Sequence, residues 1–205
     1  MSGMRNAMLA VGGLIAVGAA GAAGTHAAGL WGNDPAACSG TVVTAPLGGP
    51  FTLTAHTGET VSRDDLKGTP TLLYFGYSTC PDICPMELTD MAEAADALAE
   101  RGVDVRTAFV TVDPARDDQA RMAEYVGFFH DEMIGLTGEK AATDTAAKAY
   151  KVWHRQVDDP DLPGGYAVDH TGYVYLLDEE ARTTAVFAKG SGVEALTEGV
   201  ACRFG

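Results

Sequence analysis

The sequence predicts a single α/β domain in which helices cover both faces of a central mixed sheet. Short apolar runs, such as residues 72–75, alternate along the chain with longer segments whose apolar residues recur at helical spacing. Strands that alternate with helices are typical of parallel β-α-β units. The 205 residues, 46% of them hydrophobic and 20% charged, suit one globular domain with an appendage better than two domains.

The expected elements begin with an N-terminal β hairpin. Residues 51–55 and 59–62 flank a turn at residues 56–58, which predicts that hairpin. A buried strand at 71–76 then leads into a helix at 85–99, where Leu88, Met91 and Leu98 keep helical spacing. The other expected elements are strands at 103–112, 134–136, 173–177 and 185–188, helices at 117–129, 139–150 and 193–200, and an extended piece at 151–157.

The N-terminal residues predict an export segment. No residue between Asn6 and Asn33 carries a fixed charge, and residues 7–23 are rich in small and aliphatic side chains. Residues 25–27 offer a signal-peptidase site, whereas Arg5 equally suits an uncleaved membrane anchor. Both alternatives stay open, and either one delivers an extracytoplasmic protein, anchored or secreted at the periplasmic face of the inner membrane.

The domain organisation follows from this composition. Residues 1–29 are expected to be the signal peptide or anchor, and residues 30–50, with Gly, Pro, Ser and Asn but no sustained period, a linker. Residues 51–205 are expected to form the folded domain.

The chain is acidic, with a net charge of −14 and a pI near 4.5. Nucleic acid is therefore excluded as an expected partner, because phosphate binding needs clusters of Lys and Arg. A basic protein or a cation is more compatible with this charge. The simpler explanation is that acidity keeps an exported protein soluble.

Four cysteines acquire a particular meaning in an exported protein, since oxidising compartments permit lasting disulfides. Cys38 lies near the start of the domain and Cys202 near its end, and the termini of compact domains are often neighbours. A Cys38–Cys202 disulfide is one expectation. The alternative is that Cys38 lies in the linker and pairs with nothing.

The other two cysteines, Cys80 and Cys84, are four residues apart where a strand ends and a helix begins. Pro85 is suited to a first helical turn, so we expect Cys84 at the cap position. The unpaired N–H groups of a helix start favour thiolate over thiol there. Two such thiolates can bind a soft metal or exchange disulfides.

The order of elements is that of thioredoxin-like domains: a dicysteine at the carboxyl end of an early strand leads into a helix, and a β hairpin and a last helix close the chain. In that layout the loop entering the strand at 173–177 faces the cysteine loop. His170 lies in this loop and could meet Cys80 and Cys84. Two thiolates and an imidazole form a ligand set suited to copper, as Cu(I) or Cu(II).

At these residues the chain resembles the Sco/SenC family of copper proteins, which assist assembly of the CuA centre of cytochrome c oxidase. The matching pieces are residues 74–85 with the Cys-Pro-Asp-Ile-Cys-Pro segment, residues 110–114 with Arg116 and Asp117 following, and Asp169-His170. The resemblance covers roughly residues 51–200. It implies a thioredoxin-like fold, a membrane tether, and copper held by Cys80, Cys84 and His170.

Several nearby residues have simpler expected roles. Asp113-Pro114 is expected to end a strand, with Asp117 or Asp118 opening the next helix. Met86 is expected to pack rather than to add a copper ligand. Asp169 could hydrogen-bond and orient the imidazole of a metal-bound histidine.

Two functions remain open from sequence. A metallochaperone would bind one copper ion and pass it to the CuA-bearing subunit of cytochrome c oxidase or to another acceptor. A thiol-disulfide oxidoreductase would use Cys80 and Cys84 as a redox-active pair on the cysteines of a copper-accepting protein. Either needs a thiol reductant. A peroxiredoxin-type peroxidase and a structural zinc site fit less well, the latter because zinc normally takes four ligands.

Overall fold

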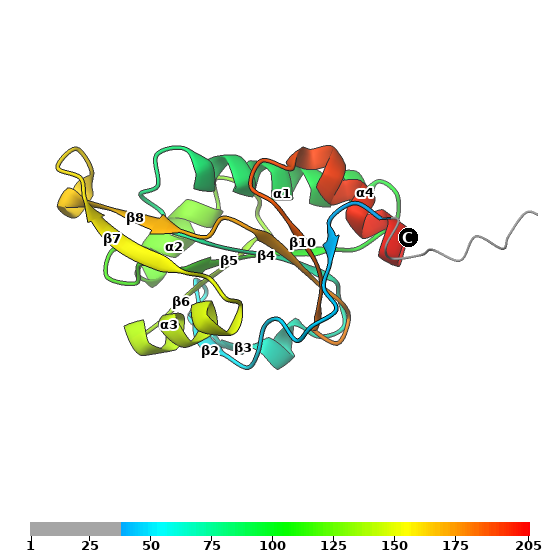
Figure 1. The fold of residues 1–205 in the computed structure, drawn as a ribbon, viewed down its shortest axis with the longest axis horizontal. Helices are drawn as coiled ribbons and strands as arrows, with labels where there is room; N and C mark the ends of the chain where they lie inside the picture. Colours follow the sequence, from blue (N-terminus) through cyan, green and yellow to red (C-terminus); the bar gives the residue numbers. More distant parts are fainter. Residues whose placement is uncertain (1–37) are drawn as a thin grey trace, which may run out of the picture. The chain divides into compact units, whose positions relative to one another are not determined.

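The computed structural model describes residues 38–205 (Figure 1). The strands are β1 (Thr41–Val42), β2 (Thr52–Ala55), β3 (Thr60–Ser62), β4 (Thr71–Gly76), β5 (Arg106–Thr111), β6 (Ile134–Thr137), β7 (His154–Asp158), β8 (Tyr166–His170), β9 (Val174–Leu177) and β10 (Thr183–Phe187). The helices are α1 (Ile83–Ala99), α2 (Gln119–Val126), α3 (Lys140–Ala149) and α4 (Gly192–Phe204), with short 3-10 turns η2 (Arg63–Leu66) and η3 (Pro163–Gly165).

Eight strands form one mixed sheet in the order β1-β10-β9-β4-β5-β6-β2-β3. The central strands β4, β5 and β6 run parallel, and antiparallel strands flank them on both sides. Figure 1 shows α1 and α4 together on one face of this sheet and α3 on the other. The predicted α/β class, a mixed sheet with helices on both faces, is confirmed.

Side-chain alternation along β4 builds a different core on each face of the sheet. All six residues of β4 are buried, as expected for a strand covered on both sides. Phe75 points to one face, where its ring lies 5.3 Å from that of Tyr150 and 5.9 Å from that of Tyr175. Its neighbour Tyr74 points to the opposite face and lies 6.4 Å from Phe109.

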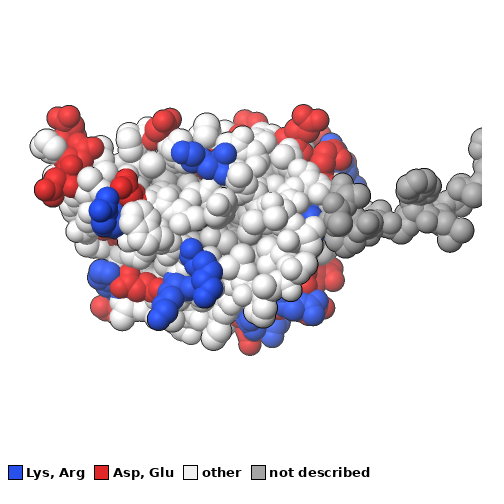
Figure 2. Space-filling model, in the orientation of Figure 1, with Lys and Arg blue, Asp and Glu red and all other residues white. Residues whose placement is uncertain are grey.

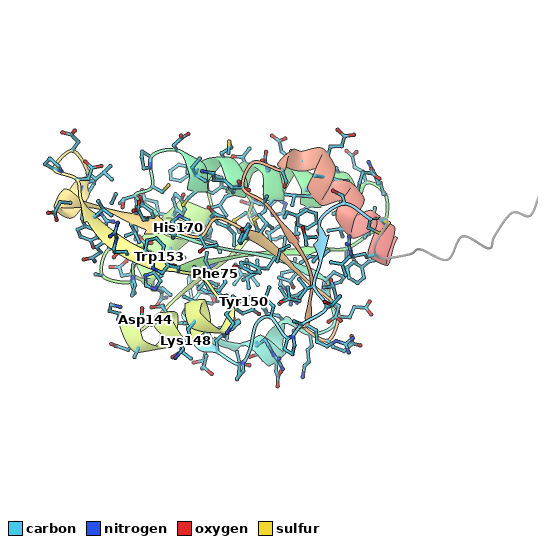
Figure 3. The ribbon with its side chains drawn as sticks, in the orientation of Figure 1. Phe75, Asp144, Lys148, Tyr150, Trp153 and His170 are labelled. Atoms are coloured by element: carbon cyan, nitrogen blue, oxygen red, sulfur yellow. A yellow bond between two sulfur atoms is a disulfide. The ribbon has the colours of Figure 1, made fainter. Side chains whose placement is uncertain are left out.

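Charged side chains lie mainly along the margins of the face drawn in Figure 2, with acidic and basic groups interspersed, while uncharged side chains form its middle. The same face is drawn with side chains as sticks in Figure 3. Some of the charges are exposed pairs between neighbouring helical turns, such as Lys140 with Asp144 at 2.6 Å. Exposed pairs of this kind contribute little to stability.

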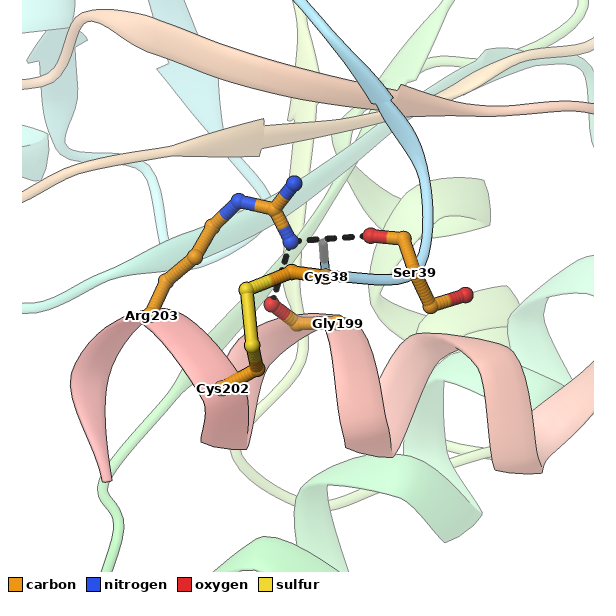
Figure 4. The surroundings of a disulfide bond; sticks show 5 residues. All are labelled: Cys38, Ser39, Gly199, Cys202 and Arg203. Carbon is orange, nitrogen blue, oxygen red and sulfur yellow. Dashed lines mark hydrogen bonds between the residues drawn. A yellow bond between two sulfur atoms is a disulfide. The ribbon is translucent and has the colours of Figure 1, made fainter. Parts of the chain in front are cut away.

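The disulfide between Cys38 and Cys202 is present (Figure 4). It joins residues 164 positions apart and ties the entry of the domain to α4. Arg203 adds to this junction, because its Nη1 donates to the carbonyl oxygens of Ser39 and Gly199 at 2.8 and 2.7 Å. Of the two alternatives left open by sequence, the bridge is therefore the correct one.

The stretch from residue 38 to residue 50, expected as the end of a linker, packs against the domain. Its strand β1 pairs with β10, with Thr41 opposite Val186. The expected export segment at residues 1–29 and the first part of the linker lie outside the described residues. Between residues 38 and 205, none of the helices combines the length and apolar character that crossing a membrane requires.

One pair of strands was not predicted. β7 and β8 form a separate two-stranded antiparallel sheet, which pairs His154 with His170 at one end and Asp158 with Tyr166 at the other. The sequence indicated only an extended piece at 151–157, because the β7 residues are largely polar and mostly exposed. This hairpin carries His170.

Candidate metal centre

Cys80 and Cys84 lie where β4 gives way to α1, at the carboxyl edge of the parallel strands. The prediction that Cys84 occupies the cap position is wrong, because the helix begins at Ile83 with Asp82 as its N-cap. Pro85 is tolerated in the third helical position, since N–H groups of the first turn have no partner within the helix. Cys84 is consequently a buried helical residue, whereas Cys80 stays in the preceding loop and is partly exposed.

The helix start acts on Cys80 rather than on Cys84. The backbone N–H of Cys84 donates to the Cys80 sulfur at 3.4 Å. Hydrogen bonds from the Cys84 side chain, and then from the backbone N–H groups of Asp82 and Cys84, lower the pKa of the Cys80 thiol to about 3, against an opposing effect of burial. Cys80 is therefore the thiolate of the reduced, metal-free pair.

Cys84 has the opposite tendency. Burial raises the pKa of the Cys84 thiol well above its ordinary range, and the neighbouring Cys80 thiolate raises it further. The expectation of a thiolate at Cys84 is thus wrong for the metal-free protein. The pair is split into one thiolate and one thiol that share a hydrogen bond.

His170 meets this pair from β8, as the sequence predicted. Its Nε2 lies 3.4 Å from the Cys84 sulfur, and its Nδ1 lies 3.1 Å from the carbonyl oxygen of Thr171. Because a carbonyl only accepts, we assign the ring proton to Nδ1, which leaves the Nε2 lone pair facing the cysteines. The ligand atoms of Cys80, Cys84 and His170 all lie within 4.8 Å of one another, and no second such group occurs among the described residues.

Two tyrosines hold the imidazole edge-on. The ring of Tyr74 lies 6.0 Å from that of His170 and the ring of Tyr77 lies 5.8 Å away, both close to perpendicular. Burial raises the pKa of Tyr74, so its hydroxyl stays protonated and points at the Cys84 sulfur at 4.0 Å. The imidazole is thereby restricted in orientation before any ion binds.

A buried carboxylate that the sequence assigned to a helix start instead anchors the cysteine loop. Asp117 accepts hydrogen bonds from the backbone N–H and the hydroxyl of Ser78, at 3.0 and 2.6 Å, and from the hydroxyl of Thr111 at 2.6 Å. Burial raises the pKa of Asp117. Asp118 is the residue that caps α2, accepting from the N–H of Arg121 at 2.8 Å. The sequence held one indication of this second role for Asp117. Two adjacent aspartates precede the helix, and one of them suffices as its cap.

Asp169 and Met86, which the sequence places beside the metal ligands, are both exposed. Asp169 is exposed and lies 3.5 Å from Arg155, and the carbonyl of Thr171 orients the imidazole instead. Met86, expected to pack, is 41% exposed.

The split pair has a measurable consequence for alkylation of the reduced protein by iodoacetamide. Since the pKa of Cys80 is lowered to about 3, its thiolate persists across neutral pH, and its reaction rate should be nearly flat between about pH 5 and 8. An ordinary thiol would react about tenfold faster per pH unit over this range. Cys84 should be labelled only after unfolding. Peptide mass spectrometry checks this, and labelling of Cys84 before Cys80 would contradict it.

The comparisons with known proteins agree with the geometry. The family model described as SCO1/SenC matches residues 40–204. The chain is 41% identical over 157 residues to the mitochondrial protein SCO1 homolog 1 of Arabidopsis thaliana, which covers 76% of this chain but 46% of that protein, or about half its length. It is also 41% identical over 160 residues to protein SenC of Rhodobacter capsulatus, which covers 77% of this chain and 71% of that protein.

Solved structures are similar over most of the described chain. The crystal structure of Arabidopsis thaliana ScoI with copper bound has a TM-score of 0.72 at 41% identity and covers 75% of this chain and 95% of that one. Bradyrhizobium japonicum ScoI with copper bound has a TM-score of 0.69 at 35% identity and covers 76% of this chain and 98% of that one. The expected thioredoxin-like fold is confirmed.

Proposed function

The chain belongs to the SCO1/SenC family, and on that premise we propose that it binds one copper ion through Cys80, Cys84 and His170. The observation that carries the proposal is the convergence of two sulfurs and an imidazole nitrogen within 4.8 Å. Thiolates favour Cu(I), and the imidazole also suits Cu(II). The donor set therefore fits copper in either oxidation state.

Binding requires the Cys84 thiol to lose its proton, because the metal ligand is the thiolate. Cys80 already provides one thiolate, and the hydrogen bond from Nδ1 to Thr171 keeps the Nε2 lone pair of His170 available. One proton is released per ion bound, so copper affinity should rise with pH while Cys84 is protonated in the metal-free protein.

We further propose that copper is cargo, handed to the CuA-bearing subunit of cytochrome c oxidase or to another copper acceptor. Cys80 is partly exposed and Cys84 is buried, so an incoming ligand would displace the sulfur of Cys80 first. A thiol reductant is needed upstream, because an oxidised Cys80–Cys84 pair cannot ligate copper.

The alternative is an extracytoplasmic thiol-disulfide oxidoreductase acting on the cysteines of a copper-accepting protein. The split pair suits it, with Cys80 as the attacking thiolate and Cys84 as the protected partner. His170 favours metal transfer, since an imidazole whose Nε2 faces the buried sulfur at 3.4 Å is a ligand that disulfide exchange does not need.

For location we propose the extracytoplasmic side of a membrane, with residues 1–29 as a signal peptide or an anchor and residues 30–37 as the link to the packed domain. The export-type composition of that segment and the Cys38–Cys202 disulfide support this, because lasting disulfides form in oxidising compartments.

The test is copper transfer to the reduced soluble CuA domain of oxidase subunit II. We expect the copper-loaded protein to pass copper to the CuA domain, measured as the copper content of that domain after the two proteins are separated, and the loaded Cys80→Ser variant to release copper without directed transfer. As a control, the reduced, metal-free parent is mixed with the oxidised CuA domain, and the free thiols of the CuA domain are counted. Thiol reduction without any copper transfer would overturn the chaperone proposal in favour of the oxidoreductase.

A further inference from the structure

The third candidate ligand sits on an element that is not part of the main sheet. As strands, β7 and β8 pair with each other and with no other strand of the described residues, and Figure 1 shows them extending away from the end of the eight-stranded sheet. The distance between His170 and the cysteines therefore depends on how this hairpin is held against the domain. At the His170 end, His154 Nε2 lies 3.5 Å from Asp144 Oδ1 of α3.

The far end of the hairpin is held by Arg116, from the loop that follows β5. Its Nη1 donates to the carbonyl oxygens of Pro163 and Tyr166 at 2.6 and 2.8 Å. The guanidinium carbon lies over the ring of Tyr166, 3.8 Å from its centroid, and 5.5 Å from the centroid of Tyr77. A planar fork with several donors suits this combination of two carbonyls and a ring face.

Asp113 completes the attachment. Its carboxylate accepts from Nε of Arg116 and from the hydroxyl of Tyr166, the latter at 3.0 Å. The side chain of Asp113 is 2% exposed and that of Arg116 is 12% exposed, so the pair is buried beneath the hairpin. We call Asp113, Arg116 and Tyr166 the hairpin clamp.

The strand β8 connects the hairpin clamp with the metal centre, because it carries both Tyr166 and His170. Side chains of a strand alternate between its faces, so Tyr166, Val168 and His170 lie on one face of β8. Val168 is buried, whereas Asp169 on the other face is exposed, so the clamped face is the one turned toward the domain. Tyr77 gives a second connection, because its ring contacts His170 edge-on while the guanidinium of Arg116 lies nearby.

We propose that Arg116 is a positioning residue that holds His170 in register with Cys80 and Cys84 through the β7–β8 hairpin. The test of this proposal by copper affinity rests on the proposed function, whereas the test of where the His170 imidazole lies does not. The two are therefore tested separately.

The first test uses the reduced, metal-free full chain and the variant Arg116→Lys, which keeps a positive charge beside Asp113 but loses the planar fork. The ring protons of His170 should be shifted in NMR spectra by Tyr74 and Tyr77. In Arg116→Lys they should move toward ordinary histidine positions, while those of His130 stay unchanged. The matched control is Arg155→Lys, on the same hairpin but in an exposed pair with Asp169.

The second test measures copper affinity by competition with a chromophoric chelator. Arg116→Lys should bind copper about tenfold more weakly, the effect of a lost supporting contact, and Arg155→Lys should stay within about twofold of the parent. The double variant Arg116→Lys with His170→Ala should bind no more weakly than His170→Ala alone, because both act on the same ligand.

Two results would overturn the proposal for Arg116. Unchanged His170 resonances in Arg116→Lys, or a double variant whose two affinity losses simply multiply, would overturn the proposal. If the parent fails to bind copper, the proposed function fails and the NMR shifts alone decide on the clamp. Should Arg116→Lys lose its near-ultraviolet circular dichroism, Tyr166→Ala replaces it, since this variant keeps the Asp113–Arg116 pair. Unmoved His170 resonances in Tyr166→Ala would equally overturn it.

Discussion

Replacing both Cys38 and Cys202 by alanine is expected to lower the free energy of unfolding by about 4 to 5 kcal/mol, the largest stability change we expect from a single pair of residues. The bond closes a loop of 164 positions, and in the chain-entropy model a long closure restricts the unfolded chain most. For a domain of this size the midpoint of thermal unfolding should fall on the order of 10 °C or more.

The copper site should survive this change at temperatures where the variant stays folded. The C-terminal end of α4, marked C in Figure 1, and His170, labelled in Figure 3, lie toward opposite ends of the view. A matched control is Arg101→Ala, which removes an exposed ion pair to Glu198 of α4 and should cost less than about 1 kcal/mol. Calorimetry checks both. A double alanine variant as stable as the Arg101 control would show that the bridge is dispensable.

Replacing His170 by alanine is expected to weaken copper binding by more than about 100-fold, because loss of supporting contacts alone typically costs about 10- to 100-fold. Reduction of a test disulfide should persist, since the main cause of the lowered pKa of Cys80 is its hydrogen bond with Cys84, which this substitution leaves in place. The two activities of the pair should therefore separate in one variant.

Copper affinity and the rate of disulfide reduction are measured side by side on His170→Ala and on a control, His130→Ala. His130 lies on the turn after α2 and pairs with Asp96 at 3.3 Å. Parental copper affinity in His170→Ala would remove His170 from the ligand set. A collapse of disulfide reduction together with copper binding would instead assign this residue to thiol chemistry.

The sequence predicted the central sheet and the place of the two cysteines because both depend on strong local patterns. The apolar run of β4 and the helical spacing of Leu88, Met91 and Leu98 determine a β-α unit in which the cysteines follow the carboxyl end of the strand. The position of His170 followed from strand order and from the family resemblance. The Cys38–Cys202 disulfide was left as one of two alternatives, because sequence gives no distance between sulfurs.

The sequence could not predict the protonation of the pair. The expected cap at Cys84 came from Pro85, which fits any position of the first helical turn and therefore does not fix where the helix begins. A shift of two positions in the helix start, from Cys84 to Asp82 as the cap, buries Cys84 and places the sulfur of Cys80 at the helix N–H groups.

The supports of the site were missed for a different reason. Asp117 and Arg116 stand in a recognised segment, yet their partners Ser78 and Tyr166 are 39 and 50 positions away. No local pattern reports such contacts. The β7–β8 hairpin was not predicted either, because the polar residues of β7 lack the apolar alternation that indicates a half-buried strand.

We expect two sulfurs and one imidazole nitrogen to bind a single copper ion. X-ray absorption at the copper edge, recorded on the reduced chain loaded with one equivalent of Cu(I), measures these ligands. The spectrum should show two sulfur neighbours and one nitrogen neighbour with imidazole scattering, and that scattering should be lost in His170→Ala. A parent spectrum with sulfur neighbours only, or with an imidazole signal that persists in the variant, would contradict it.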